Sequence, residues 1–437
     1  MLEIHRTHRA KIRNYSQVVE SLDRHGWSAS KLWNVANYHS RKVWEETGEI
    51  PDHEELKDEL KTHPKYKGLH SQSSQRVLEE LAEAFNSWYS SDDDRDNPPG
   101  YRKENYYDDE GRRVHEEHPR STVTWKQNGI RHDTKNNRVR LSKGANHKEH
   151  PRAWEYILVE YETRPGVEVE NLQQIRAVYD QSKERWELHL VCKGEIETPD
   201  APGNETAGID LGISNFAAIA YSTEDADLYP GNRLKQDGYY FPKEIANCDD
   251  SGGDRATRLH HKWSERRTHF FHSLAKHIVE RCVEKGVGRI NVGDLEGVRD
   301  DENGESKNWG THGNLDLHGW AFDRFTSILE YKAKVEGIEV VEVSERDTSK
   351  TCCVCGREDD SQRVERGLYV CETCDVAFNA DVNGAENIRL DSNASNSESA
   401  PSLGEDRSTG WLAQPGVYLH DLSRGFQPRT AVVDSKP

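Results

Sequence analysis

The sequence lacks any apolar run of about 18 residues, the length that a membrane-spanning helix requires. Its beginning, MLEIHRTHRAKIRNYSQ, has no apolar stretch after the charged residues, so no secretory signal is expected. Cysteine is sparse, at 8 of 437 residues, and four cysteines (Cys192, Cys248, Cys282 and Cys353) follow no paired spacing. This usage suits a reduced compartment better than a disulfide framework. We therefore expect a cytoplasmic protein with no membrane segment.

Basic residues are also scarce, because 59 Lys and Arg stand against 78 Asp and Glu, for a formal net charge of −19. Such acidity with a mean hydropathy of −0.97 would indicate disorder. The chain nevertheless holds 11 Trp, 17 Tyr and regularly spaced apolar residues, so a folded protein is expected. We interpret the acidity as that of a halophile. It does not exclude a nucleic-acid partner, because binding depends on local basic patches.

The first two hundred residues divide into a helical part and a β-rich part. Apolar spacing predicts two helices between Tyr15 and Glu46 and a further helix over Ser74–Tyr89. A charged, turn-forming stretch over residues 91–117 is expected to be a linker or surface loop. Short β-rich segments then continue to about residue 200, which predicts a small antiparallel barrel or sandwich.

From Thr206 onward strands and helices alternate, which is typical of an α/β sheet. The predicted helices are Asp254–Lys285 and Trp320–Glu336, and the strand AGIDLGI begins the region. Between the second strand and the first helix we expect a loop. The tail after Leu390 is rich in Ser and Asn without periodicity, so it is expected to be mostly disordered.

Four cysteines follow the spacing C-x2-C-x15-C-x2-C: Cys352, Cys355, Cys371 and Cys374. Each CxxC turn brings two thiolates to one side, and zinc in structural sites takes four tetrahedral ligands. A structural zinc site that holds a loop together is the favoured interpretation. Direct contact with nucleic acid through Arg357, Arg363 and Arg366 is the alternative. Cys353 is expected to point away from the metal.

Two aspartates stand at places where an acid can hold a metal. Asp210 lies in the strand segment GIDLGI, and Asp381 opens a predicted helix in NADVNGAENI, directly after the cysteine pairs. Either acid alone is more often a structural cap. Phosphodiester hydrolysis with two Mg²⁺ ions, however, needs carboxylates that converge from distant parts of the chain. Together the two acids indicate that chemistry.

In order and spacing, GIDLGI, TSKTCCVCG, the second CxxC and DVNGAENI resemble the RuvC domain of the TnpB (OrfB) family of transposon proteins. RTHRAKIRNY, SQSSQRVLEELAEAF and STVTW resemble that family's recognition and wedge regions. The resemblance implies a multidomain α+β fold. Its parts are a β-barrel wedge over 1–10 and 115–200, a helical recognition module with linker over 11–114, an RNase H-like (RuvC) α/β domain over 205–390 with a zinc ribbon inserted at 348–378, and a disordered tail over 391–437.

TnpB proteins are RNA-guided DNA endonucleases of insertion sequences, so the resemblance implies the same activity here. It implies Mg²⁺ at Asp210 and Asp381, which match the family's first and third RuvC acids. Zinc is implied at the four paired cysteines, which match its metal ligands. The implied partners are a guide RNA from the transposon end and a double-stranded DNA target, with the protein reading a short flanking motif.

One position departs from the family pattern, because Gly293 stands where the second RuvC glutamate belongs. Asp294, Glu296 and Glu345 are three substitutes. Adjacent strand residues point to opposite faces, so Asp294 would need a bulge to point inward. Glu345 needs none if its strand lies beside that of Gly293. If no acid substitutes, the chain is a cleavage-deficient RNA-guided DNA-binding protein with a regulatory or transposon-maintenance role.

The predicted helix Asp254–Lys285 is basic in an acidic chain. Its apolar stripe is explained by packing against a sheet. Its excess of positive charge instead favours a surface that faces phosphates. The residues expected to bind nucleic acid are Arg255, Arg258, Lys262, Arg266 and Arg267.

Overall fold

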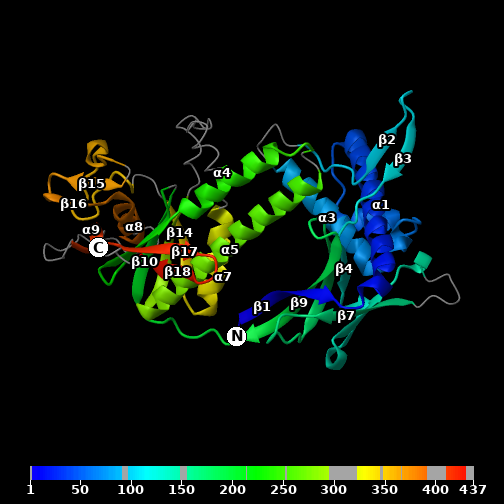
Figure 1. Cartoon of the computed structure of the whole chain (residues 1–437), viewed down its shortest axis with the longest axis horizontal. Coiled ribbons are helices and arrows are strands. Elements are labelled where there is room, and N and C mark those ends of the chain that lie inside the picture. The colour runs from blue at the N-terminus through cyan, green and yellow to red at the C-terminus, as the bar shows by residue number, and fades with distance from the viewer. Residues whose placement is uncertain are drawn as a thin grey trace, which may run out of the picture. The chain divides into compact units, whose positions relative to one another are not determined.

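The computed structural model describes residues 2–90, 97–147, 155–212, 214–250, 253–294, 322–344, 348–365, 367–390 and 410–429 (Figure 1). Contacts divide the chain into two units, residues 1–196 and 197–437. Within the described ranges, no helix has the length and apolar character needed to cross a bilayer. The expected multidomain α+β architecture, with a helical module, a barrel and an RNase H-like sheet, is confirmed.

The first unit is built from a helical module and a set of antiparallel strands. Its helices are α1 (Tyr15–Thr47), α2 (His53–Leu60) and α3 (Ser71–Tyr89). Its strands are β1 (Leu2–Ile12), β2 (Glu104–Tyr107), β3 (Arg113–Glu117), β4 (Val123–Lys126), β5 (Ile130–Asp133), β6 (Arg138–Ser142), β7 (Tyr156–Glu162), β8 (Leu172–Asp180) and β9 (Arg185–Ile196).

Helix α1 is one continuous helix of 33 residues, so the prediction of two helices over this stretch is wrong. Gly26 lies in its interior, where glycine ordinarily costs about 1 kcal/mol relative to alanine. A Cβ at Gly26 would lie 2.8 Å from the Trp186 ring of β9, so the glycine makes room for that ring. Packing against Trp186, which is distant in the sequence, therefore keeps α1 helical at Gly26, a residue that weakens the helix locally.

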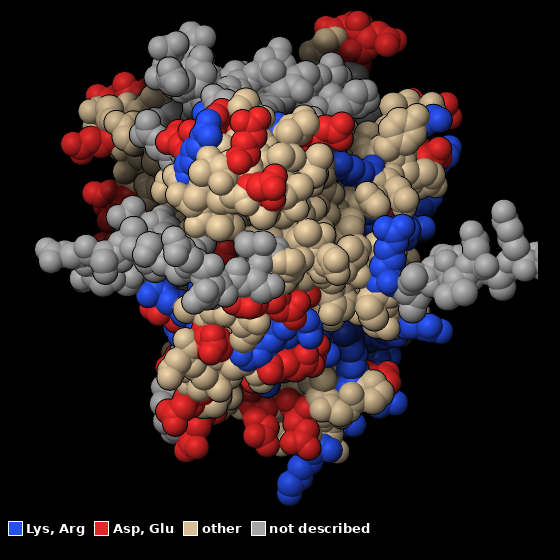
Figure 2. Space-filling model, turned by 90° about the vertical axis from the view of Figure 1, so that its left-hand side faces the viewer, with Lys and Arg blue, Asp and Glu red and all other residues tan. Residues whose placement is uncertain are grey.

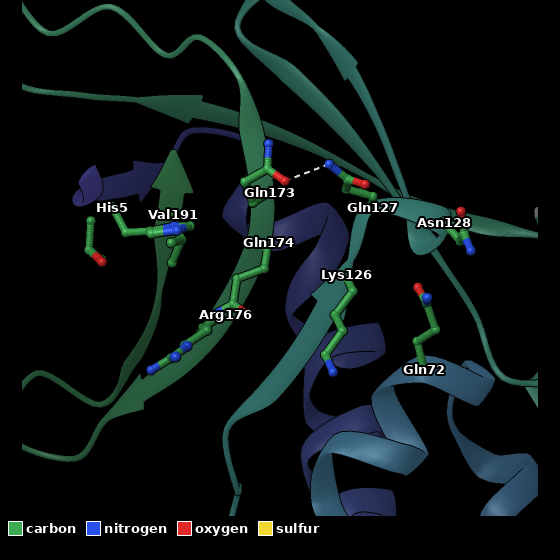
Figure 3. Close-up of a pocket in the computed structure, with 10 residues that line it drawn as sticks. His5, Gln72, Lys126, Gln127, Asn128, Gln173, Gln174, Arg176 and Val191 are labelled. Atoms are coloured by element: carbon green, nitrogen blue, oxygen red, sulfur yellow. Dashed lines mark hydrogen bonds between the residues drawn. The ribbon is translucent and has the colours of Figure 1, made fainter. Parts of the chain in front are cut away.

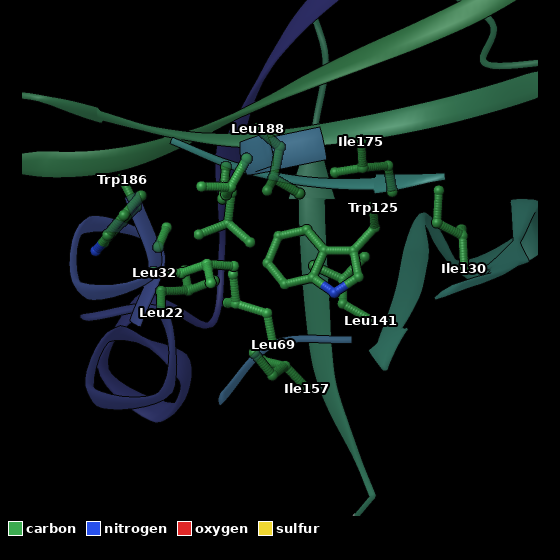
Figure 4. Close-up of a cluster of buried hydrophobic side chains, with 14 of the residues drawn as sticks. Leu22, Leu32, Leu69, Trp125, Ile130, Leu141, Ile157, Ile175, Trp186 and Leu188 are labelled. Atoms are coloured by element: carbon green, nitrogen blue, oxygen red, sulfur yellow. The ribbon is translucent and has the colours of Figure 1, made fainter. Parts of the chain in front are cut away.

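Seven of the strands form one antiparallel sheet in the order β4-β8-β9-β1-β7-β6-β5. Strand β5, at one edge, contacts β8 near the other edge, so the sheet curls into a near-closed barrel. Burial alternates along β7 and β9, as one-sided packing requires. Figure 4 shows the result, in which Trp125 and Trp186 pack with leucines of α1 in one core.

Part of the stretch expected to be a linker is ordered. Strands β2 and β3 pair as an antiparallel hairpin, with Glu104 opposite Glu117. The hairpin's β3 residues are almost all exposed, which explains why no apolar pattern revealed it. The side chain of Asn34 in α1 donates a hydrogen bond to the backbone carbonyl of Arg102 at 3.0 Å and accepts one from its backbone N–H at 2.6 Å. These two bonds fix the start of this segment.

The second unit holds a mixed sheet with helices on its faces. Its strands are β10 (Glu205–Leu211), β11 (Asn215–Tyr221), β12 (Asp225–Pro230), β13 (Val287–Asp294), β14 (Glu339–Ser344), β15 (Leu368–Cys371), β16 (Val376–Asn379), β17 (Gly416–Asp421) and β18 (Gly425–Pro428). Its helices are α4 (Asn232–Ala246), α5 (Asp254–Glu284), α7 (Phe322–Val335), α8 (Ala380–Leu390) and α9 (Gly410–Ala413).

The main sheet has the order β14-β13-β10-β11-β12-β17-β18, with parallel pairing of β10, β13 and β14. Helices α5 and α7 cover one face through a core that includes Phe216, Phe270 and Phe325. Helix α8 and the cysteine-rich segment cover the other face, against Ala218 and Ala220. This division decides which strand residues can reach the cysteine-rich segment.

The structure differs from one expectation for this unit and bears on another in part. The stretch after Tyr221, expected to be a loop, contains β12 and α4. Within the tail, expected to be mostly disordered, residues 410–429 form α9, β17 and β18, and Gly416 of β17 pairs with Asp227 of β12. These strands are short and half exposed, and their pairing is non-local, so the sequence pattern gave little sign of them.

Candidate functional site

Asp210 lies near the end of β10, on the face of the sheet that α8 covers. Its partner across the antiparallel pair is Ala218, which belongs to the core beneath α8. Side chains of neighbouring Ile209 and Leu211 point into the opposite core. The alternation of β10 therefore places the carboxylate of Asp210 against α8.

Asp381 stands in the first turn of α8, which Asn379 caps by accepting from the backbone N–H groups of Asp381 and Val382 at 3.0 and 3.1 Å. The side chain of Asp381 is 15% exposed. Asn215 donates to its Oδ2 at 2.8 Å, and Arg363 donates to its Oδ1 at 3.3 Å. Both carboxylate oxygens are thus oriented by the protein.

Two glycines allow α8 to press directly against β10. A Cβ on Gly208 would lie 2.1 Å from the backbone oxygen of Ala385 and 2.5 Å from the backbone N of Arg389. A Cβ on Gly384 would lie 2.7 Å from Oδ2 of Asp210. Real side chains do not tolerate such distances. Close backbone packing therefore brings the helix that carries Asp381 onto the strand that carries Asp210.

Burial raises the pKa of both carboxyl groups. Burial, followed by the nearby charge of Asp381, raises the pKa of Asp210 from 3.8 to about 8. Burial also raises the pKa of Asp381, although the hydrogen bond from Asn215 and the charge of Arg363 oppose this rise. Paired acids of this kind favour a bound cation, which would stabilise both as carboxylates. Oxygen donors of this type suit Mg²⁺.

The four paired cysteines form one cluster, in which all four sulfurs lie within 4.8 Å of one another. The Sγ atoms of Cys352 and Cys374 are 3.9 Å apart, and those of Cys355 and Cys371 are 3.6 Å apart. A tetrahedron with Zn–S bonds of about 2.3 Å has edges of roughly 3.8 Å. The cluster therefore fits a structural zinc ion, as its spacing predicted.

Two asparagines of α8 fasten this cluster to the helix. Asn383 accepts from the backbone N–H of Cys353 at 2.9 Å and donates to the Thr351 carbonyl at 2.8 Å. Asn387, one turn later, donates to the carbonyls of Thr348 and Thr351 at 2.7 Å. Cys353 is buried and lies outside the four-sulfur cluster, as expected. The position of Asp381 is therefore coupled to the cysteine-rich segment.

Known proteins match the chain over the regions just described. The family model "Probable transposase" (OrfB_IS605) matches residues 179–299, and the model "Cas12f1-like, TNB domain" matches residues 322–388. TnpB-like protein ORF457 of Acidianus two-tailed virus is 26% identical over 407 residues, which cover 82% of this chain and 80% of that protein. Over these regions the chain matches the TnpB/OrfB transposase family.

Other relatives of the chain are CRISPR nucleases. CRISPR-associated endodeoxyribonuclease Cas12f1 of Sulfoacidibacillus thermotolerans is 25% identical over 229 residues, 49% of this chain and 52% of that protein. The structure of a Cas12f1–sgRNA–target DNA complex matches with a TM-score of 0.54 at 14% identity, over 85% of this chain and 83% of that one. At that identity the structural match establishes a shared fold.

Gly293, which stands where the resemblance leads us to expect a second acid, lies beside Asp210. Ile209 of β10 pairs with Val292 of β13, so one residue further along both strands Gly293 comes beside Asp210. Gly293 in turn pairs with Val343 of β14, which confirms that the two strands are neighbours. Asp294 follows on the opposite face of the strand. Glu296 and Glu345 lie outside the described residues.

A buried glutamate on α8 is already paired. Glu386 is 1% exposed and receives two hydrogen bonds from Arg389, at 2.6 and 2.7 Å. Arg389 also donates to the hydroxyl of Thr206 on β10. This ion pair ties α8 to the sheet, and its carboxylate is committed to that task.

The five cationic residues expected to bind nucleic acid lie on α5 in two different settings. Arg255, Arg258 and Lys262 are exposed. Arg266 makes a double hydrogen bond to Asp237 of α4 at 2.6 and 2.7 Å, and burial lowers the pKa of Arg267. Arg266 is therefore engaged within the unit, and Arg267 is partly buried. Figure 2 shows Lys and Arg gathered in patches on one face of the molecule despite its net negative charge.

A polar pocket of about 620 Å³ opens on the first unit. Figure 3 shows side chains from four strands and α3 around it, and Gln127 donates to Gln173 across its rim. Amides, cations and few apolar groups line it: His5, Thr7, Gln72, Lys126, Gln127, Asn128, Gln173, Gln174, Arg176 and Val191. Sequence reasoning missed this pocket, as it missed Asn215, because such residues converge only in the fold.

Proposed function

We propose that this protein is an RNA-guided DNA endonuclease that hydrolyses phosphodiester bonds with Mg²⁺ held by Asp210 and Asp381. The observation that carries the proposal is the apposition of these two acids by the close packing of α8 on β10. They come from distant parts of the chain, and both lie within regions matched by the family models. Relatives of the chain include a DNA endonuclease, which supports DNA cleavage as the chemistry of these two acids.

The protein's own groups would prepare the site. Asn215 fixes Oδ2 of Asp381, and Arg363 places positive charge beside Oδ1. Bound Mg²⁺ would activate the attacking water and stabilise the leaving oxygen. The four cysteines would hold zinc as a structural ion. Because Asn383 links their segment to α8, zinc would act on cleavage only by positioning Asp381.

We assign the third acid to Glu345. The ground for this choice is the sequence spacing: Glu345 follows Val343 by two positions, strand residues two apart share a face, and Val343 lies beside Gly293. Glycine at 293 leaves room for a longer side chain from the neighbouring strand. Asp294 is the weaker candidate, because its side chain belongs to the opposite face.

The nucleic-acid partners follow from the same family context. The Cas12f1 structure that shares this fold is a complex with an sgRNA and a target DNA. Arg255, Arg258 and Lys262 are exposed and would contact phosphates. The carboxamides around the pocket of the first unit both donate and accept hydrogen bonds, as the recognition of base edges requires.

The glycine at position 293, where an acid is expected, favours a second candidate function, that of a guided DNA-binding protein that no longer cuts.

The two candidate functions are separated by measuring plasmid cleavage and plasmid binding in high-KCl buffer with Mg²⁺, using protein co-expressed with its own flanking transcript. The nuclease proposal expects wild type to cut, and Asp210→Ala to bind the plasmid without cutting it. Asp249→Asn, which changes an exposed aspartate of the same unit, should still cut. Binding without cutting by wild type supports the second function, and no guided binding refutes both.

A further inference from the structure

Two adjacent tyrosines on α4 are unusually exposed. Tyr239 is 70% exposed and Tyr240 is 52% exposed, whereas Tyr221 and Tyr229 of the same unit are fully buried. Exposure of two neighbouring large rings leaves apolar surface in water, at roughly 25 cal/mol per Å². The candidate functional site described above uses neither ring.

The helix beneath these rings is firmly held. Phe241 is buried and stacks on Trp263 of α5, with ring centroids 6.1 Å apart and planes 11° apart. Asp237 receives the double hydrogen bond from Arg266, also of α5. Figure 1 shows α4 and α5 running together as these contacts require. The tyrosines therefore stand on a rigid support, which lowers the entropic cost of binding a partner.

Positive charge surrounds the rings. Lys235, Tyr239 and Lys243 follow one another at four-residue spacing, which aligns them on one helix face. The Lys243 Nζ lies 5.9 Å from the Tyr239 ring centroid. Segments 232–243 and 255–270 together hold eight Lys and Arg against two Asp and Glu, in a chain of net charge −19. The intervening residues 244–254, which include the end of α4 and the start of α5, carry four acids, so the positive excess is local to the two segments.

Helix α4, which carries Tyr239 and Tyr240, begins beside the carboxylate pair Asp210 and Asp381. The backbone N–H of Gly231, the residue before α4, donates to the Ser214 carbonyl at 3.2 Å. The next residue, Asn215, holds Asp381. Tyr239 lies seven residues into the helix, which is roughly 10 Å along its axis. A strand that reaches the carboxylates could therefore cross these rings.

We propose that Tyr239 and Tyr240 form a stacking platform for the bases of single-stranded DNA on its way to the carboxylate pair. Aromatic rings flanked by cations are the usual means of holding single strands without sequence preference. This inference rests on the proposed function for its choice of DNA strand. Stacking itself needs no metal and no cleavage, so the two can fail separately.

The test is binding of a single-stranded DNA oligonucleotide containing 2-aminopurine to the full-length, zinc-loaded protein in Mg²⁺-free buffer without chelator, where Mg²⁺-dependent cleavage does not occur. Wild type should quench the fluorescence of 2-aminopurine, because stacking on tyrosine does so. Tyr239→Ala with Tyr240→Ala should abolish the quenching and weaken binding about tenfold or more. Tyr239→Phe should retain both. Tyr89→Ala, which removes an equally exposed ring from the first unit, should change neither.

The dependence of oligonucleotide binding on salt concentration gives a second test of the proposal. Raising KCl should shrink the effect of Lys235→Gln with Lys243→Gln, because salt screens phosphate contacts, but should leave the tyrosine effect in place. Unchanged quenching in the double alanine variant overturns the inference. So does a tyrosine effect seen only with an RNA oligonucleotide, or binding only to a protein partner. Tyrosine-dependent quenching in a protein that never cuts would keep the platform and refute the nuclease proposal.

Discussion

Substitution of Gly208 by alanine should disrupt the second unit more than the size of the added methyl group suggests. The new Cβ would lie 2.1 Å from a backbone oxygen and 2.5 Å from a backbone nitrogen of α8. Neither atom belongs to a flexible side chain, so α8 has to move from β10 by on the order of 1 Å. Overpacking of this kind costs about 1–3 kcal/mol, and backbone on both sides favours the upper end.

For a unit of this size each kcal/mol lowers the melting temperature by roughly 2–4 °C. Gly208→Ala should therefore unfold roughly 6–12 °C below wild type in thermal melts at high KCl. Because α8 carries Asp381, the same movement should slow cleavage by on the order of 100-fold. Loss of both together would link the packing to the site.

Gly194→Ala is the matched control. Gly194 also lies within a strand, β9, but its Cβ would meet Ile4 at an ordinary 3.5 Å. This variant should melt within a few degrees of wild type, because alanine fits and is the better strand residue. A Gly208→Ala protein that melts and cuts like the Gly194→Ala protein would refute the close-packing argument.

Three further outcomes follow from the site. In metal-free protein, the pKa of Asp210 is about 8 in the folded chain against 3.8 ordinarily, so the folded state holds the extra proton, and stability should fall as pH rises from about 4 to about 8. Asp210→Asn should remove that slope in urea titrations, and a slope shared by both proteins contradicts the assignment. Metal analysis should find one zinc per chain, lost in Cys355→Ser and kept in Cys353→Ala; equal zinc in both variants contradicts the ligand set. Arg389→Met should cost about 3–5 kcal/mol of stability by removing the guanidinium that pairs with the buried Glu386, and adding Glu386→Leu should restore much of it; equal stability of wild type and the single variant would show that the pair is unimportant.

The individual residues of the candidate site could be predicted because each belongs to a short sequence pattern. The CxxC pairs, the strand that ends near Asp210 and the helix that begins at Ala380 are read within a few residues. Their convergence needed the family pattern, since either aspartate alone is an ordinary cap. The outer boundaries of the predicted domains stay predictions.

What could not be predicted depends on contacts between distant residues. Trp186 fills the space at Gly26 and so keeps α1 continuous. Strand β17 forms because β12 offers it a free edge, although its own residues are only weakly patterned. Asn215 and Arg363 touch Asp381 without any motif that marks them. In each case the local structure depends on a contact with a residue far away in the sequence. A single sequence does not show which residues make that contact.

The central claim is that this chain retains a complete cleavage site although Gly293 replaces the family's glutamate. Its most direct test is the rate of guided DNA cleavage with Mg²⁺ in high KCl, compared among wild type, Glu345→Gln and Asp294→Asn. The account predicts that wild type cuts, that Glu345→Gln slows cleavage by at least about 100-fold, and that Asp294→Asn cuts at nearly the wild-type rate. Guided DNA that wild type binds but leaves intact would contradict it.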